Sequence, residues 1–230
     1  MKRLLTILFL FTCLIGFGQG NFFWSHTGVT CTGVQWINAT SIQQVSSGTT
    51  LSVYCDVFSA NSISIIHFAM YSNQSLSSIP SGWTSAGSST TSTYRTYVLT
   101  RFNATAGAGF YVTLNVPSSA IMGAVNYTFS NVSVTTINAY SGNLTSGLSF
   151  TSDALGGLRC NMAIIPIVLF SASTINETLG SGWSLPANQA FTNFSFALAT
   201  YSYAINGTAP TNYFTWSPSG YYGWQKFLIR

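Results

Sequence analysis

The sequence predicts an all-β protein, an antiparallel β-sandwich of jelly-roll or immunoglobulin-like type built from two related halves. Apolar and polar residues alternate in short runs such as 50–57, 63–70 and 194–201, and a period of two is typical of half-buried strands. Clusters of Ser, Gly, Asn and Pro separate these runs, and no stretch keeps the apolar spacing of a helix over ten residues. Aromatic residues, 15% of the chain, supply the core.

The first residues predict export. Lys2 and Arg3 precede an apolar run at 4–17 that ends in small residues, and this order is typical of a secretory signal peptide. Cleavage would follow Gly18 or Gly20, and we place the signal peptide at 1–20. The run is shorter than the roughly 20 apolar residues of a membrane span, although an uncleaved anchor is the alternative. We therefore expect an extracellular, cell-surface or virion protein.

An internal repeat with a period near 100 residues predicts the two halves. Ser81-Gly-Trp83 recurs as Ser181-Gly-Trp183, and each is followed by an alternating strand, an Asn turn and a Pro-Ser pair. The repeats are expected at about 50–137 and 158–230, joined by a loop-like segment at 138–158. One shared core buries more surface per residue than two small ones, so we favour a single sandwich at 46–230 over two small sandwiches.

The segment 21–45 precedes the first repeat and has no evident counterpart in the second. It is rich in strand-forming residues. It is the candidate donor strand, which would add itself to a neighbouring subunit's sheet through backbone hydrogen bonds. The candidate subunit contacts are Phe22, Phe23, Trp24 and Val29.

Charge is scarce, at 4% of residues against about 25% in typical proteins. Without Lys2 and Arg3 the chain has five basic and three acidic residues, a net charge of +2, with no cluster of either sign. This excludes a phosphate-binding basic patch, so nucleic acid is not an expected partner. An uncharged surface has little protection against association, so we expect self-association, a glycan coat, or both. With few carboxylates, stability should vary little with pH.

Nine Asn-x-Ser/Thr sequons occur, where random placement in a chain this rich in Ser and Thr would produce about four. Asn126 and Asn193 look like mid-strand positions. The alternative is a chain that is never glycosylated on Asn. The candidate glycosylation sites are Asn38, Asn73, Asn103, Asn131, Asn143, Asn176 and Asn206.

Three cysteines follow the leader. Cys31 and Cys55 lie in similar alternating contexts and are the candidate disulfide in an oxidising compartment. Cys160 would then be a free thiol or an intermolecular link. The alternative is three buried, unpaired cysteines. No C-x-x-C pair or nearby His predicts a metal site.

No pattern of residues predicts catalysis. His26 and His67 are the two histidines, and no paired carboxylates, G-x-S-x-G elbow or phosphate-binding loop occurs. A triad of His67, Asp56 and a serine can be drawn only on paper. His67 lies in an apolar run and is expected in the core or at an edge. We expect neither an enzyme nor a cofactor.

Aromatic residues near the C-terminus form a candidate platform for sugars, at Tyr221, Tyr222 and Trp224. The tryptophans of the two Ser-Gly-Trp repeats, Trp83 and Trp183, are expected in the core instead, because their recurrence indicates a structural role.

The run Pro80-Ser-Gly-Trp-Thr, a Tyr-rich strand and Val125-Asn-Tyr-Thr-Phe-Ser-Asn-Val together resemble β-sandwich modules of bacteriophage virion proteins and bacterial surface proteins. The resemblance covers most of the exported chain and implies a structural or adhesive role without catalytic residues. The leader ending Phe17-Gly-Gln looks like those of Bacteroidetes and their phages. In its low lysine content and its many sequons, the chain is also similar in general character to the subunits of glycosylated archaeal thread-type filaments. Those subunits donate an N-terminal strand to a neighbour.

Three functions are compatible with the sequence. The first is a non-enzymatic structural subunit of an extracellular or virion surface assembly that polymerises through strand edges into a homopolymer or a virion. The second is a monomeric carbohydrate-binding or adhesin module that uses the C-terminal aromatic residues. A secreted hydrolase is the third and weakest possibility.

Overall fold

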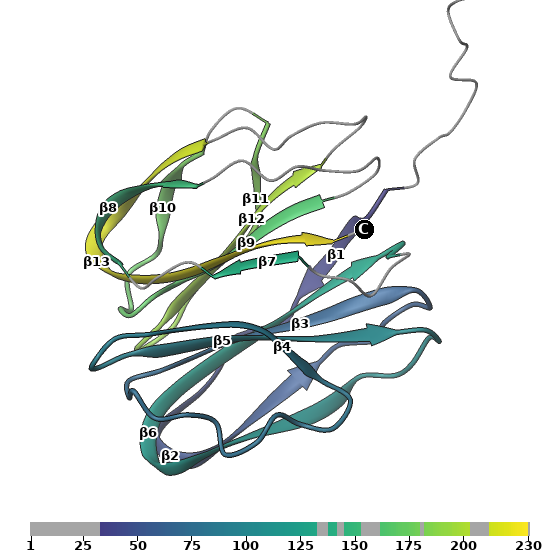
Figure 1. The fold of residues 1–230 in the computed structure, drawn as a ribbon, viewed down its shortest axis with the longest axis horizontal. Helices are drawn as coiled ribbons and strands as arrows, with labels where there is room; N and C mark the ends of the chain where they lie inside the picture. Colours follow the sequence, from purple (N-terminus) through teal and green to yellow (C-terminus); the bar gives the residue numbers. More distant parts are fainter. Residues whose placement is uncertain are drawn as a thin grey trace, which may run out of the picture. The chain divides into compact units, whose positions relative to one another are not determined.

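The strands of this protein build two antiparallel sheets that pack against each other, as a computed structural model of the chain shows (Figure 1). The structure describes residues 33–132, 138–141, 145–152, 162–179, 182–202 and 212–229. These residues contain thirteen strands and no helix, which confirms the predicted all-β sandwich. The signal peptide and residues 21–32 lie outside the described residues.

The first sheet has the strand order β1-β6-β3-β5-β4, with β2 also paired to β6. Its strands are β1 (Gln35–Ala39), β2 (Gln43–Cys55), β3 (Ser62–Met70), β4 (Thr84–Thr90), β5 (Arg95–Asn103) and β6 (Phe110–Ser130).

The second sheet has the order β10-β13-β9-β12-β11, with β7 and β8 also paired to β13. Its strands are β7 (Asn138–Ser141), β8 (Thr145–Ser152), β9 (Met162–Leu169), β10 (Asn176–Thr178), β11 (Ser184–Ala190), β12 (Ser195–Ser202) and β13 (Asn212–Ile229).

A long bent ribbon forms the frame of the first sheet. β1 and β2 run one after the other along the same side of β6, from the pair Gln35–Ser130 to the pair Cys55–Phe110. Register shifts on either side of Gly48 break this pairing, opposite the stretch of β6 that contains Pro117. Because proline cannot donate to the ladder and bulges bend a strand, the ribbon folds here and one arm covers the other.

The second sheet repeats this frame. β7 and β8 run along β13, and β9, β12 and β11 extend the sheet as β3, β5 and β4 do in the first. Its register shift falls between Thr215 and Gly220, beside Pro218. The expected loop at 138–158 therefore contains two strands, and residues 35–44 have a counterpart after all. The sequence does not predict β7 and β8, because β13, their pairing partner, follows them only after β9 to β12, and local patterns do not report such distant pairing.

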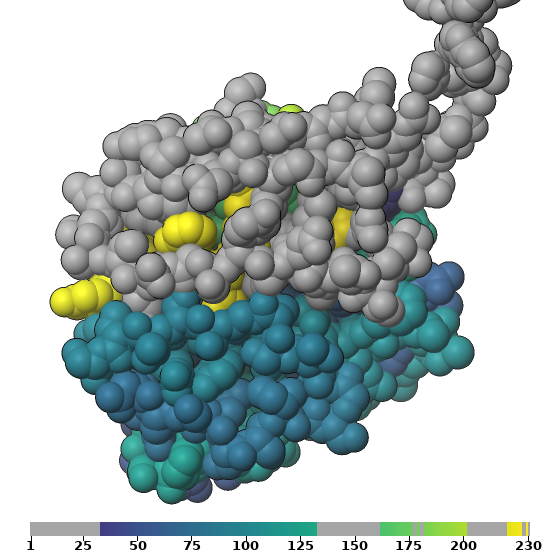
Figure 2. Space-filling model, viewed as in Figure 1, coloured from purple at the N-terminus to yellow at the C-terminus, as the bar shows by residue number. Residues whose placement is uncertain are grey.

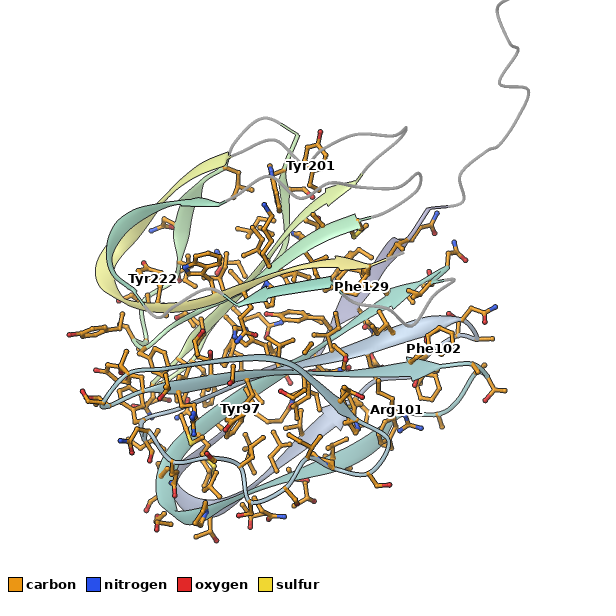
Figure 3. All side chains as sticks on the ribbon, in the orientation of Figure 1. Tyr97, Arg101, Phe102, Phe129, Tyr201 and Tyr222 are labelled. Carbon is orange, nitrogen blue, oxygen red and sulfur yellow. The ribbon has the colours of Figure 1, made fainter. Side chains whose placement is uncertain are left out.

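Three clusters of buried side chains result from this folding. One lies inside the folded first sheet, one inside the second, and one between the two sheets. Strand β3 supplies two of them in alternation, since Ile66 and Phe68 face the first sheet's own cluster while Ile63 and Ile65 face the second sheet. Figure 3 labels one member of each cluster: Tyr97 inside the first sheet, Phe129 between the sheets and Tyr222 inside the second.

The Ser-Gly-Trp repeats form matched turns before β4 and β11. Gly82 and Gly182 have φ values of 78° and 83°, a conformation that favours glycine. The tryptophans that follow, Trp83 and Trp183, are 7% and 8% exposed. The turns therefore aim each indole into the cluster of its own half, as the recurrence predicted.

Candidate functional site

The outer edge of β4 is an open sheet edge. Within the described residues β4 pairs with β5 alone, so one side of its backbone has no strand beside it in the same sheet. Its residues are Thr, Ser, Ala and Gly, with no charge and no proline, and Ser85, Ser88 and Thr90 are exposed. Natural edges are usually protected by lysine, proline or a bulge. Here a bulge lies between Ser85 and Gly87, and strands β7 and β13 of the second sheet lie near β4 without pairing with it.

The matching edge strand of the second half, β11, is protected. It has a bulge at the same place and Pro186 within it. Two of its side chains are also bound to neighbouring segments: Asn188 Nδ2 donates to the Ile175 carbonyl at 2.6 Å, and Gln189 Nε2 donates to the Thr40 carbonyl at 3.0 Å. The two halves therefore share a fold but differ at their edges.

Two side-chain hydrogen bonds cross the opposite side of the first sheet. Because the ribbon bends, the two ends of the β1–β2 strand approach each other. Asn38 Nδ2 donates to Asp56 Oδ2 at 2.6 Å, and the Tyr54 backbone N–H donates to Gln43 Oε1 at 3.3 Å. These bonds cover polar backbone and carboxylate groups that would otherwise face solvent at an edge.

The candidate subunit contacts Phe22, Phe23, Trp24 and Val29 lie outside the described residues. The C-terminal part of the predicted donor segment does not project from the fold, because Gln35–Ala39 pairs with β6 of the same chain. Trp36 packs there on Phe129 with ring centroids 5.4 Å apart, and Val34 is buried between the sheets. A donor strand would therefore have to come from residues 21–32.

The predicted glycosylation sites differ in accessibility. Asn73, Asn131 and Asn176 are exposed and Asn38 is half-buried, while Asn143 and Asn206 lie outside the described residues. The predicted site at Asn103 is not accessible, because Asn103 is 4% exposed and its Nδ2 donates to Ser62 Oγ and Ser64 Oγ at 3.2 and 3.0 Å. The folded chain does not offer this amide to a glycan.

The proposed C-terminal platform is not a surface. Tyr222 is fully buried in the cluster inside the second sheet, and Trp224 packs against the same cluster. Tyr221 is 46% exposed, but its ring lies against Tyr94 at 5.0 Å. Alternation along β13 turns neighbouring residues to opposite faces, so three near-consecutive aromatic residues cannot share one face.

His67 is buried between the two sheets. It is 0% exposed, and neither ring nitrogen has a hydrogen-bond partner within the described part of the chain. Burial lowers the pKa of His67 from 6.5 to about 3, so the ring is neutral at physiological pH. Asp56 is held by Asn38 instead, and the structure does not bring it to His67. In the described segments no three His, Cys, Asp or Glu side chains group as metal ligands would.

Cys55 is a buried free thiol in the structure. Burial raises its pKa to about 12, although nearby Arg101 has a smaller opposing effect. Its predicted partner Cys31 and the third cysteine, Cys160, lie outside the described residues, so the pairing of Cys31 with Cys55 stays a prediction.

Comparisons with protein-family models, curated proteins and solved structures produce no match for this chain. Among the described residues no helix is long and apolar enough to span a membrane.

Proposed function

We propose that this chain is a non-enzymatic structural subunit of an extracellular or virion surface assembly, in which copies join through strand edges. The observation that carries the proposal is the open edge of β4, which has neither charge nor proline along its length. An unpaired row of backbone N–H and C=O groups is a template for another strand. With three acidic residues in the whole chain, repulsion between copies is weak.

The difference between β4 and β11 supports an open polymer rather than a closed pair. Of the two matched edge strands, β4 contains neither charge nor proline, whereas β11 carries Pro186 and two of its side chains are hydrogen-bonded to neighbouring segments. A surface that receives a different segment of the next copy makes a head-to-tail contact, and repeated head-to-tail contacts produce a ring or a filament. The donor in this proposal is the segment 21–32, which directly precedes β1.

The test places a lysine on each of the two matched edges. Ser88→Lys adds a charge to exposed β4, and Ala190→Lys adds the same charge to an exposed position of β11. Sedimentation velocity and negative-stain imaging of the processed chain should show polymers for the unaltered protein and for Ala190→Lys, and monomers for Ser88→Lys. An unaltered chain that stays monomeric at high concentration, or a Ser88→Lys chain that polymerises normally, would contradict the proposal.

A deletion tests the donor separately. Removal of residues 21–30, which spares Cys31, should abolish polymers and leave the melting temperature unchanged, because Val34 and β1 remain in place. The deletion must stop there, since loss of Trp36 would also remove ring contacts with Tyr127 and Phe129. Normal assembly of this shortened chain would rule out residues 21–30 as the donor.

A further inference from the structure

The outer face of the bent ribbon carries an exposed pair of tyrosines. Tyr111 of β6 is 69% exposed, more than any other large hydrophobic side chain in the described residues. Tyr54 lies opposite it in the β2–β6 pairing, with ring centroids 5.2 Å apart and ring planes at 53°. The residues beside them, Val53 and Val112, point the other way into the first sheet's cluster. Both rings therefore lie on the outer, solvent-facing side.

The Tyr54 ring is held in position by the backbone around it. A side chain at Gly109 would overlap the Tyr54 hydroxyl and ring, so the ring lies across this glycine. The backbone N–H of Tyr54 also donates to Gln43 Oε1. A half-buried ring fixed in this way loses little freedom when a ligand packs on it.

Hydroxyl and amide groups continue the face along the ribbon. Ser52 pairs across the strands with Thr113, and Thr50 pairs with Asn115. These four side chains are exposed. Thr50 Oγ1 donates to Asn115 Oδ1 at 3.1 Å. This bond fixes the orientation of the Asn115 amide, and its Nδ2 can still donate to a ligand. With the tyrosines they form an extended strip of rings and hydrogen-bonding groups without an ionised side chain.

We propose that this strip, Tyr54, Tyr111, Ser52, Thr113, Thr50 and Asn115, binds a neutral, extended β-linked polysaccharide. The C–H faces of sugar rings pack on aromatic side chains, and sugar hydroxyls exchange hydrogen bonds with Ser, Thr and Asn. A straight, flat chain matches the part of the β2–β6 ribbon from Thr50 to Cys55, whose pairing has no register shift. This function is separate from assembly through β4, because the strip lies on a sheet face and not on an edge.

The chemistry of the strip selects this ligand over two others. No lysine or arginine lies among the six residues, so the strip offers no positive charge to the carboxylates or sulfates of an acidic polysaccharide. Protein interfaces bury a core of several apolar anchors, whereas here two tyrosines adjoin a row of small polar side chains. Its neutrality and its hydrogen-bonding groups complement an uncharged polyhydroxyl chain.

The test measures equilibrium binding of the full processed chain to hydroxyethyl cellulose, xyloglucan and galactomannan, with carboxymethyl cellulose as the charged counterpart of the same backbone. We expect binding to at least one neutral polysaccharide and about ten-fold weaker binding after Tyr111→Ala. Phe191→Ala is the matched control, because Phe191 is 51% exposed in a different part of the fold. That variant should bind as the unaltered chain does. Gly109→Ala, which displaces the Tyr54 ring, should weaken binding while leaving Tyr111 in place.

Several results would overturn the proposal. These are no binding to any of the three neutral polysaccharides, stronger binding to carboxymethyl cellulose, or unchanged binding by Tyr111→Ala. A fourth is a Tyr111→Ala chain that keeps its polysaccharide affinity but loses self-association, since the strip would then contact a second copy. Because Tyr111 is exposed, its replacement should leave the melting temperature unchanged, which separates lost binding from misfolding. The Ser88→Lys variant should bind polysaccharide normally even if it cannot polymerise.

Discussion

His67 of β3 meets Phe196 of β12 edge to face, with ring centroids 5.3 Å apart and ring planes at 84°. In its own sheet the histidine has Val98 and Val125 as register partners on either side. An imidazole without a hydrogen-bond partner in the described structure thus lies in the apolar contact between the two sheets. Figure 2 shows the first half, coloured blue to teal, as a continuous surface on the viewed face.

Stability should therefore fall in acid because of His67. Its pKa is about 3 in the folded chain and near 6.5 when unfolded, so between these values the unfolded state binds a proton that the folded state does not. The free energy of unfolding should drop by about 1.4 kcal/mol per pH unit as pH falls from about 6.5 to about 3. Below that range both states are protonated and this contribution stops changing. This one residue is an exception to the weak pH dependence expected from the scarcity of carboxylates.

Urea unfolding of the unaltered chain and of His67→Leu at pH 7, 5 and 4 checks this. The leucine variant should be more stable at each pH, because an unpaired buried polar group is lost. Its advantage should grow as pH falls. Parallel stability profiles for the two proteins would show that His67 does not carry the dependence.

Gln225 should be replaceable by an apolar residue with a gain in stability. It is 0% exposed, its amide has no partner in the described residues, and it lies against Gly87 of β4. Its counterpart in the first half, Val125, is apolar. Gln225→Met keeps the length of the side chain, so we expect a gain of about 1–3 kcal/mol in the free energy of unfolding, measured by urea denaturation. Gln225→Glu, which buries a carboxylate, should destabilise the fold; a stable Glu variant would indicate that solvent reaches this site.

Gly123 should tolerate no side chain, because the second half packs directly on it. A Cβ at this position would lie 2.5 Å from Cδ2 of Phe194, a fully buried ring in the contact between the sheets. Gly123→Ala should cost about 1–3 kcal/mol of stability, since the ring must move within a packed core. Gly48→Ala is the control, because the nearest side-chain atom there is a Val45 methyl at 3.2 Å that can give way. Equal thermal stability of the two variants would mean that the sheets pack more loosely than the structure shows.

Cys55 should resist alkylation until the protein unfolds. The thiol is fully buried and its pKa is raised to about 12. An alkylating reagent therefore cannot reach the sulfur, and the reactive thiolate is scarce. At pH 8 iodoacetamide should modify Cys55 at least about a hundred-fold more slowly in the native chain than in denaturant. Rapid modification of the native chain would contradict this burial. Failure to react in denaturant without a reductant would instead show that Cys55 is paired, with Cys31 the predicted partner.

Much of the architecture was predictable because it depends on local sequence patterns, the alternation of apolar and polar residues and the repeated turn motif. Alternation along β3, β5 and β12 predicted strands with two faces, and both faces of β3 prove to be buried. The recurrence of Ser-Gly-Trp predicted matched turns, since glycine at positive φ and an inward-facing indole both depend on a few adjacent residues. Local residues determine such features wherever the rest of the chain lies.

Features that depend on distant partners were not predictable in this way. Tyr222 and Tyr111 are both tyrosines in long strands, β13 and β6. Tyr222 is nevertheless buried, whereas Tyr111 is 69% exposed. The sequon at Asn103 looked like a turn, yet its side chain is buried beside Ser62 and Ser64. The ribbon partner of β7 and β8, the burial of His67 against Phe196 and the unequal edges β4 and β11 were likewise decided by tertiary structure. The sequence by itself determined strands, turns and their repetition, because these follow from steric and hydrophobic preferences of neighbouring residues. Only the packing of two sheets, through contacts between residues far apart in the chain, decided which of their faces and edges remain exposed to solvent.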